Sequence, residues 1–399
     1  MHARQVDLDK ARQEARLPQN ITEYEDLARR ALPAALNYYV AGYSEDGAAH
    51  ARNLKSFRER AFVPATLVDV SRRSSATKLL GTQYRLPFGI APMGSSRLMA
   101  KDADTVLASA AAHAEIPFIL SGASLTPMEE VRQAGSTSWF QAYIPGEDAR
   151  FRALIERVEA AGFDTIVVTV DTAVQGAHEL AARHGFRSPV QFGLGLASQA
   201  IIRPRWLWSV MIRSWMSGLR LRFENMDASP GPLVFSPNLV RDIGPRDALS
   251  WRHVEAIRQR WQGKLVIKGI MAPADAVRAS QLGIDGIIVS NHGGRQSDAV
   301  ISSLDALEMI SREDLSLAVI YDGGIRRGSD ILKALRLGAD FVFIGRPMLQ
   351  AVAAGGPAGV AHAISLLEAE VSLNMGLLGI SDLTELGSID LHRVSDFQE

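Results

Sequence analysis

Eight short apolar segments recur along the sequence and constrain the fold more than any other feature. Unbroken segments of this length are typical of strands that are buried on both faces of a sheet. The predicted strands cover residues 86–91, 117–120, 138–143, 165–170, 265–268, 286–289, 317–321 and 341–344.

Helical patterns separate most of these segments. They cover residues 101–113, 150–161, 251–261, 273–282, 329–337 and 353–373. Strands that alternate with helices form parallel sheets with right-handed crossovers. Eight such units close a TIM (β/α)8 barrel, so we predict this α/β fold. An open doubly wound sheet is the alternative.

Two long stretches lie outside the alternation. Residues 1–80 precede the first predicted strand, and we expect a helical segment that packs over one end of the barrel formed by residues 81–399. An insertion of about residues 176–250 separates the fourth and fifth strands. Excursions this long inside compact domains are usually functional or disordered.

The composition excludes several function classes. The 43 Lys and Arg residues balance 44 Asp and Glu residues, so the chain has no overall positive field for nucleic acid. It contains no cysteine, which excludes disulfides, thiolate metal sites and cysteine nucleophiles, and we assign no metal ligands. Residues 1–20 are polar, and no apolar segment approaches the roughly 20 residues of a membrane span. We therefore expect a cytoplasmic protein.

Polar or glycine-rich residues follow every predicted strand. In a parallel barrel these strand ends share one face, where the active sites of this fold lie. In chain order they include Pro92, Met93, Gly94, Ser121, Gln141, Tyr143, Thr169, Asp171, Lys268, Ser290, His292, Asp322, Gly324, Arg326, Gly345 and Arg346. We expect one active site at this face.

The last two strand ends indicate a phosphate site. Gly324 with Arg326, and Gly345 with Arg346, place small residues and guanidinium groups in the two loops that usually bind phosphate in this fold. The alternative is that the glycines only form turns. Gly193 and Gly195 do not make a dinucleotide fingerprint, because the third glycine and the preceding strand are missing.

Donors and acceptors at four other strand ends suit the pyrimidine edge of a flavin. They are Ser121, Gln141, Thr169 and Lys268. A lysine there would stabilise the anionic reduced ring, although a barrel lysine paired with a carboxylate is the alternative. His292 is the best candidate for a general base, Asp171 could orient it, and Arg295 could bind a carboxylate. His50 is expected on the surface.

These residues resemble a known signature. Residues 290–296 (SNHGGRQ) are similar to the active-site motif of the FMN-dependent α-hydroxy-acid oxidases and dehydrogenases, which include glycolate oxidase, flavin-type lactate dehydrogenase and mandelate dehydrogenase. Further similarity covers residues 67–74, 139–143, 169–171 and 322–327, and extends from about residue 24 to the C-terminal helix outside the insertion.

The resemblance implies a role for each matching residue. His292 would take the substrate proton with Asp171 as its partner, Arg295 and Tyr38 would contact the substrate carboxylate, and Tyr143 would lie beside the substrate oxygen. Residues that would surround the FMN ring and ribityl chain are Pro92, Met93, Gly94, Ser121, Gln141, Thr169, Lys268 and Ser290. Those that would hold the ribityl and phosphate groups are Asp322, Gly324, Arg326, Gly345 and Arg346.

Two positions in the loop after the fourth strand depart from the family pattern. His178 stands where the family usually has a second carboxylate-binding arginine, and Ala181 stands where an acidic residue is usual. A protonated His178 would be a weaker contact than an arginine fork, and Arg183 could substitute from a shifted loop. The flavin half of the site matches the family, whereas the substrate half is altered.

Within the insertion, residues 203–223 contain five arginines and no acidic residue. Trp208, Met211, Ile212, Trp215 and Leu219 would share one face of a helix. Such a helix can lie in a membrane interface, and membrane-associated dehydrogenases of the family carry an insertion here. The alternative is packing on the barrel or on another subunit.

The leading functional hypothesis is FMN-dependent oxidation of a small L-2-hydroxy acid to the 2-oxo acid, by hydride transfer or through a carbanion. The electron acceptor would be oxygen or a quinone, and the family resemblance implies a homo-oligomer, often a tetramer. A second hypothesis is oxidation of an atypical substrate, such as an amine or a natural-product hydroxyl, motivated by His178. A flavin-binding barrel without turnover and a phosphosugar-binding barrel are the alternatives from other classes.

Overall fold

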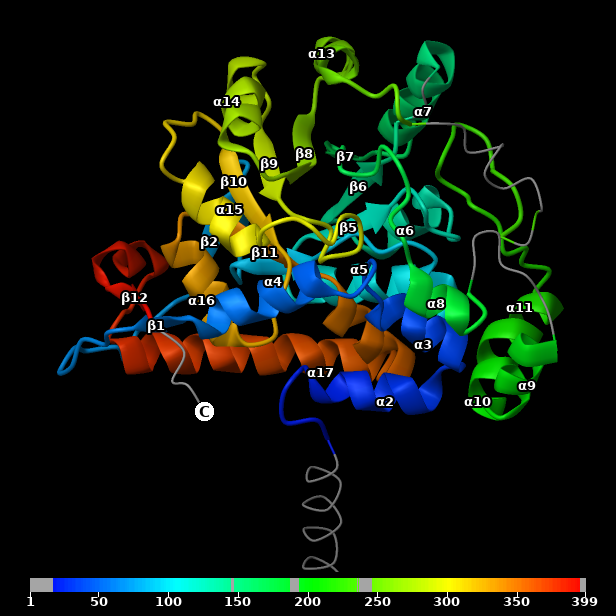
Figure 1. Cartoon of the computed structure of the whole chain (residues 1–399), viewed down its shortest axis with the longest axis horizontal. Coiled ribbons are helices and arrows are strands. Elements are labelled where there is room, and N and C mark those ends of the chain that lie inside the picture. The colour runs from blue at the N-terminus through cyan, green and yellow to red at the C-terminus, as the bar shows by residue number, and fades with distance from the viewer. Residues whose placement is uncertain (1–16, 145–146, 187–193, 235, 237–245, 395–399) are drawn as a thin grey trace, which may run out of the picture.

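The eight predicted strands form a closed barrel of parallel strands, hydrogen-bonded in chain order (Figure 1). The computed structural model describes residues 17–144, 147–186, 194–234, 236 and 246–394. The barrel strands are β4 (Phe88–Ile90), β5 (Phe118–Ser121), β6 (Ser138–Ala142), β7 (Thr165–Thr169), β8 (Lys264–Ile270), β9 (Gly286–Val289), β10 (Ala318–Asp322) and β11 (Phe341–Ile344). The TIM-barrel prediction is confirmed, and the open-sheet alternative is wrong.

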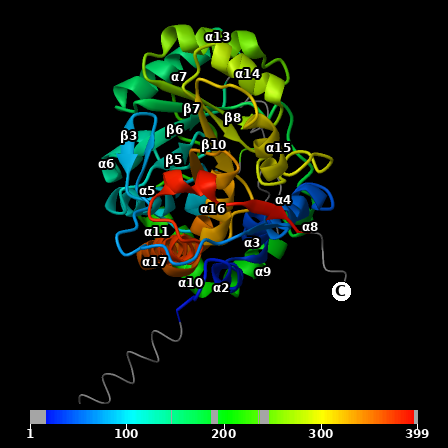
Figure 2. The same cartoon turned by 90° about the vertical axis from the view of Figure 1, so that its left-hand side faces the viewer.

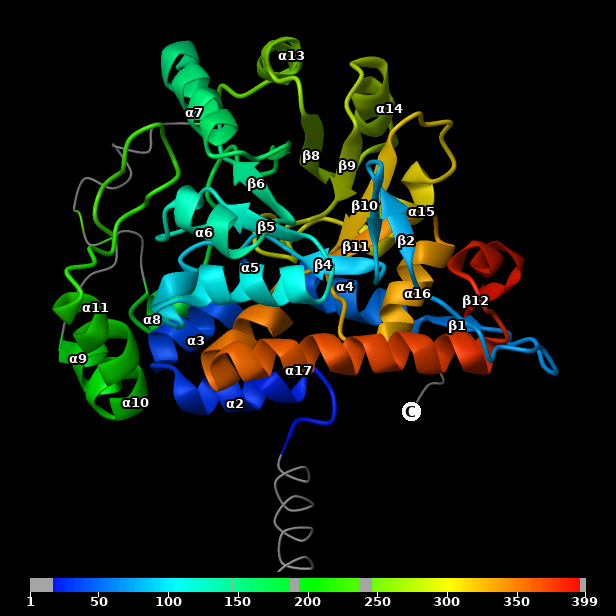
Figure 3. The ribbon, with the colours of Figure 1, turned by 180° about the vertical axis from the view of Figure 1, so that it is seen from behind.

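Helices surround the barrel as the alternation predicted. They are α5 (Ala103–His113), α6 (Met128–Ala134), α7 (Asp148–Ala160), α13 (Trp251–Arg260), α14 (Pro273–Gln281), α15 (Ser303–Ile310), α16 (Gly328–Arg336) and α17 (Arg346–Leu378). Helices α6 and α15 were not predicted, because their two turns are too short for a clear apolar period. Helix α17 is longer than predicted and bends at Gly356, where φ is +57°, before Pro357. It lies alongside α2 (Figures 1 and 3).

Alternate residues of the strands fill the barrel interior. Val167 points inward with Ile288 and Phe341, whereas Ile166 and Val168 belong to the outer core against the helices. The hairpin of β2 (Thr77–Leu79) and β3 (Thr82–Tyr84) contributes Leu79 and Tyr84 to the inner cluster. Because Phe341 begins β11 and its ring centroid lies 5.7 Å from that of Tyr84, the hairpin covers the N-terminal end of the barrel.

The N-terminal helices lie against loops at the opposite end. They are α2 (Glu23–Ala31), α3 (Ala34–Ala41) and α4 (Ala48–Arg58). The backbone N–H groups of Ala48 and Ala49 donate to the Asp298 carboxylate in the loop after β9, at 2.9 and 2.7 Å. Strand β1 (Arg60–Phe62) pairs with the C-terminal β12 (Leu391–Arg393), which follows η3 (Leu383–Ser388) (Figure 2). The expected boundary at residue 80 falls within the β2–β3 hairpin.

The insertion after β7 folds into short helices that lie beside α3 (Figures 1 and 3). They are α8 (Glu179–Arg183), α9 (Leu194–Ile201), α10 (Pro204–Trp206), the π-helix η2 (Leu207–Ile212) and α11 (Arg213–Met216). The helical structure ends at Met216, before the predicted stripe reaches Leu219. Trp206 and Val210 are buried, and the indole N–H of Trp206 donates to Leu98 O at 2.8 Å. This contact anchors the insertion to the barrel.

Candidate active site

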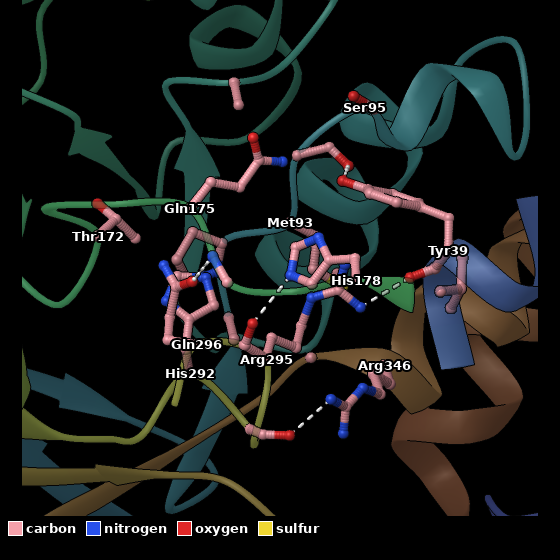
Figure 4. A pocket seen from close by; sticks show the side chains of 18 of the residues that line it. Tyr39, Met93, Ser95, Thr172, Gln175, His178, His292, Arg295, Gln296 and Arg346 are labelled. Atoms are coloured by element: carbon pink, nitrogen blue, oxygen red, sulfur yellow. Dashed lines mark hydrogen bonds between the residues drawn. The ribbon is translucent and has the colours of Figure 1, made fainter. Parts of the chain in front are cut away.

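A cavity of about 870 Å³ opens where the barrel strands end. This volume lies in the range of small-molecule and cofactor sites. Residues from most of the barrel loops, helix α3 and the insertion line it together (Figure 4). The predicted site residues that line it are Pro92, Met93, Gly94, Tyr143, His178, Lys268, His292, Arg295, Asp322, Gly324, Arg326, Gly345 and Arg346.

His292 and Asp171 form a pair at the cavity wall. Nδ1 of His292 lies 3.0 and 3.2 Å from the two carboxylate oxygens of Asp171. A carboxylate only accepts hydrogen bonds, so Nδ1 carries the proton and Nε2 keeps its lone pair. Burial would raise the pKa of Asp171, but the positive charge that His292 carries once it is protonated, its hydrogen bond and the charge of Lys268 outweigh burial and lower that pKa. The pair can therefore take up a proton at Nε2.

The backbone after β9 turns sharply to present this histidine. His292, Gly293 and Gly294 all have left-handed φ values, of +56°, +65° and +75°. A Cβ at Gly294 would lie 2.5 Å from the backbone N of His50. The strained φ of His292 is held because its own N–H donates to Ser290 Oγ at 3.0 Å. This explains why glycines follow the histidine.

Lys268 lies beneath this turn and is buried. Its ammonium group contacts Ser290 Oγ at 2.8 Å and Asp322 Oδ2 at 2.9 Å. Burial disfavours the charge, but Asp322 and Asp171 outweigh it and raise the pKa of Lys268. The structure shows the carboxylate pairing that was the alternative interpretation of Lys268. Lys268 also lines the cavity, and its role toward a flavin stays a prediction.

The polar residues behind the cavity leave one donor without a partner. Gln141 accepts from Ser121 Oγ at 3.1 Å through its oxygen, whereas its buried Nε2 group has no hydrogen-bond partner. Thr169 pairs in register with Lys268 on the neighbouring strand. Buried donors are rarely left unsatisfied, so this amide fits a bound ligand that carries an acceptor, as a flavin pyrimidine edge does.

The opposite end of the cavity collects positive charge. Arg326 and Arg346 both line it, as do Gly324 and Gly345. Burial lowers the pKa of Arg346, and the nearby charges of Arg295 and Arg326 lower it further. The Nε atom of Arg346 is buried without a partner, and this residue begins the long helix α17. A helix N-terminus with two crowded guanidinium groups, one of which has an unpartnered Nε, fits a phosphate.

His50 joins this cluster and is not the surface residue that we expected. Its Nδ1 accepts a hydrogen bond from Arg346 Nη1 at 3.0 Å. Burial, followed by the charges of Arg346 and Arg326, lowers the pKa of His50 to about 3. The ring is therefore neutral at pH 7. Sequence reasoning missed it because its neighbours come from distant loops.

Of the two adjacent tyrosines of α3, Tyr39 lines the cavity and Tyr38, the predicted contact, does not. The hydroxyl of Tyr39 donates to Gly94 O at 3.3 Å, whereas the Tyr38 ring stacks on His184 with centroids 3.7 Å apart. Successive residues of a helix point about 100° apart, so the α3 face decides which tyrosine reaches the site. Arg295 donates through Nη1 to Tyr39 O at 2.7 Å (Figure 4) and to Gly42 O at 3.0 Å.

His178 lies beside Arg295 but carries no charge. Its Nε2–H donates to the Arg295 carbonyl at 2.9 Å (Figure 4). Burial, followed by the charge of Arg295, lowers the pKa of His178 to about 4. Arg183 does not line the cavity, because it is exposed and pairs with Glu179 at 3.2 Å. Neither residue supplies the missing cation.

Arg246 is a cavity residue that sequence reasoning missed. It lies in the segment before α13, and its Cζ atom is 4.3 Å from the centroid of the Tyr143 ring. Burial raises the pKa of Tyr143. No local motif distinguishes Arg246 from the other arginines of the insertion, so only the tertiary structure reveals it.

Comparisons with known proteins identify the family. Residues 28–393 match the family described as FMN-dependent dehydrogenase. The L-lactate oxidase of Nostoc sp. is 39% identical over 94% of this chain and 98% of its own length, and the L-lactate dehydrogenase of Caulobacter vibrioides is 36% identical over 92% and 95%.

Solved structures give the same result. A monotopic membrane protein, (S)-mandelate dehydrogenase, superposes with a TM-score of 0.84 at 31% identity, covering 94% of this chain and 99% of that chain. A mandelate oxidase variant superposes with a TM-score of 0.79 at 29% identity, covering 95% and 100%. The cofactor of the family fits the unpaired Gln141 amide and the arginine cluster. The chain therefore belongs to the FMN-dependent dehydrogenase family and is an FMN-dependent oxidoreductase.

Proposed function

We propose that this enzyme oxidises a small L-2-hydroxy acid to the corresponding 2-oxo acid, with His292 as the base. The His292–Asp171 pair, directed at a cavity that Arg295 also lines, is the observation that carries the proposal. Relatives named for L-lactate and mandelate support this substrate class.

Each residue around the cavity has its own proposed role in the oxidation. Nε2 of His292 accepts the substrate proton, and the Asp171 carboxylate stabilises the imidazolium that results. Arg295 attracts the substrate carboxylate, and Tyr39 and Tyr143 line the same cavity. General-base catalysis of this kind contributes roughly 10²- to 10⁴-fold in rate.

FMN bound in this cavity supplies the two-electron acceptor of the oxidation. We propose that Arg326, Arg346 and Gly345 hold its phosphate and that Gln141 and Lys268 hold its ring. The remaining residues proposed for the cofactor are Pro92, Met93, Gly94, Ser121, Thr169, Ser290, Asp322 and Gly324. Lys268, which stays protonated beside Asp322, would favour negative charge on the ring.

Anaerobic mixing of the holoenzyme with a panel of 2-hydroxy acids tests the proposal. We expect at least one acid to bleach the flavin absorbance, and His292→Ala to slow bleaching by about 10²-fold or more. His113→Ala is the matched control, because His113 is exposed on α5. A holoenzyme that no 2-hydroxy acid bleaches, but that an amine or a larger alcohol does, would support the atypical substrate instead.

We also propose that the insertion docks on an anionic membrane surface. None of the helices that the structure describes has the length and apolar character to cross a bilayer. However, Trp215 is 81% exposed and Trp208 is 55% exposed, next to exposed Met216, Ile201 and Ile202. Arg205, Arg213 and Arg220 are exposed in the same segment. Exposed tryptophans with arginines are typical of interfacial binding.

Vesicle co-sedimentation tests this docking. We expect binding to vesicles containing phosphatidylglycerol, weakened by salt and by a double Trp208→Ser, Trp215→Ser variant. Leu373→Ser with Leu377→Ser, which removes exposed apolar residues of α17, is the control. Equal binding by all three proteins would contradict the proposal. The electron acceptor, oxygen or a quinone, and the homo-oligomer remain predictions, tested by mixing reduced enzyme with each acceptor and by light scattering.

A further inference from the structure

The substrate side of the cavity holds a cation that the family resemblance did not assign. Arg246 lines the cavity together with Tyr143, Arg295 and His178. Its guanidinium carbon lies over the Tyr143 ring at 4.3 Å from the centroid. Among the described residues, no carboxylate forms an ion pair with Arg246. Burial lowers the pKa of Arg246, while Tyr143 opposes the shift.

A bound 2-hydroxy acid brings a carboxylate that needs more than one donor group. Nη1 of Arg295 already donates to two backbone carbonyls, Tyr39 O in α3 and Gly42 O just after α3. His178 is neutral, and its Nε2–H donates to the Arg295 carbonyl. The position where the family usually has its second arginine therefore supplies no positive charge.

We propose that Arg246, which lies over the Tyr143 ring, binds the substrate carboxylate jointly with Arg295 and replaces the missing arginine. This inference rests on the proposed function. Tyr143 lies between Arg246 and the catalytic pair in electrostatic terms, because the charges of Arg246, Asp171 and Lys268 all affect the pKa of its hydroxyl. A guanidinium at this wall supplies a planar pair of donors, which suits a carboxylate.

Arg246 could instead act only as a cation–π support for the Tyr143 ring. The two roles separate when the charge of the ligand changes. A carboxylate contact affects acids and leaves uncharged analogues nearly unaffected, whereas loss of ring support affects both. The experiment therefore compares a 2-hydroxy acid with its own amide, for example lactate with lactamide, or whichever pair the wild-type enzyme oxidises.

The variants are Arg246→Gln, Arg246→Lys and His178→Gln, all as FMN-loaded protein. Arg252→Gln is the matched control, since Arg252 is exposed on the adjacent helix α13. We expect Arg246→Gln to raise KM for the acid by about 10- to 100-fold, in line with the loss of one hydrogen bond to a charged group. We expect less than about threefold for the amide, and partial recovery in Arg246→Lys.

Calorimetric binding of oxalate gives a readout without turnover. We expect its Kd to rise in Arg246→Gln by a similar factor and to stay within about threefold in His178→Gln and Arg252→Gln. Unchanged oxalate binding in Arg246→Gln, or equal losses for acid and amide, would overturn the inference. Failure of the proposed function would be distinguishable, because the wild-type flavin would then not be reduced by any 2-hydroxy acid while oxalate binding still tests Arg246.

Discussion

Replacing Arg346 with glutamine should weaken binding of FMN much more than binding of riboflavin, which lacks the phosphate. Arg346 begins helix α17, lines the cavity and has a buried Nε without a partner. A hydrogen bond to a charged group contributes about 1.5–3 kcal/mol, which corresponds to about 10- to 150-fold in Kd because about 1.4 kcal/mol is tenfold.

The substitution also disturbs the protein itself. Arg346 Nη2 donates to Gly293 O at 2.6 Å and to Gly42 O at 3.2 Å, and glutamine cannot satisfy both. The resulting loss of affinity is common to both flavins, because both meet the same disturbed apoprotein. The ratio of the FMN and riboflavin dissociation constants therefore isolates the phosphate contact.

The assay is a titration of flavin-free protein with each flavin, followed by quenching of flavin fluorescence. We expect the riboflavin-to-FMN ratio of Kd values to fall by about 10- to 150-fold in Arg346→Gln. Arg346→Lys should lose less, because it keeps the charge but not the planar fork. An unchanged ratio in Arg346→Gln would refute the assignment of the phosphate to this arginine.

Three further predictions follow from the geometry of the site. Asp171→Asn should slow substrate-dependent flavin bleaching by about 10²-fold or more without changing FMN affinity; an unchanged rate would contradict the pairing with His292. The pKa of His178 is lowered to about 4 from its usual value near 6.5. Between these pH values the unfolded chain binds a proton that the folded chain does not, so the free energy of unfolding is highest above pH 6.5 and falls as the pH decreases toward 4. The melting temperature of His178→Gln should therefore fall less than that of the wild type over that pH range. Equal decreases in the two proteins would argue against the lowered pKa of His178. Gly324→Ala places a Cβ 2.6 Å from a backbone oxygen of α4 at φ +74°, whereas Gly162→Ala meets nothing within 4 Å at φ +82°. Chemical unfolding should show that Gly162→Ala lowers the free energy of unfolding by about 1–2 kcal/mol and that Gly324→Ala lowers it further.

The sequence was a good guide to the barrel because the strand signal is local. A strand covered on both faces must be apolar along its length, and β4 to β11 all arise from such segments. The strand ends then placed His292, Lys268 and Arg346 at one cavity, since parallel strands end on one face. Helices α6 and α15 were missed, because two turns do not establish an apolar period.

Contacts between distant segments were not predictable in the same way. Tyr39 and Tyr38 are adjacent, and only the packing of α3 selects the one that faces the cavity. The neutral state of His178 depends on burial beside Arg295. His50 joins the arginine cluster only because α4 packs on the loop after β9.

The order of residues thus determined the barrel and the polar residues, glycines and arginines that follow its strands, because each comes from patterns within a few turns or strands. Tertiary structure alone decided which charges meet. Arg246 and Tyr143 are far apart along the chain and lie together only because the insertion returns to the barrel. Electrostatic interactions depend on distance and burial rather than on sequence spacing. The charged neighbours on the proposed substrate side of the cavity can therefore be identified only from the three-dimensional structure.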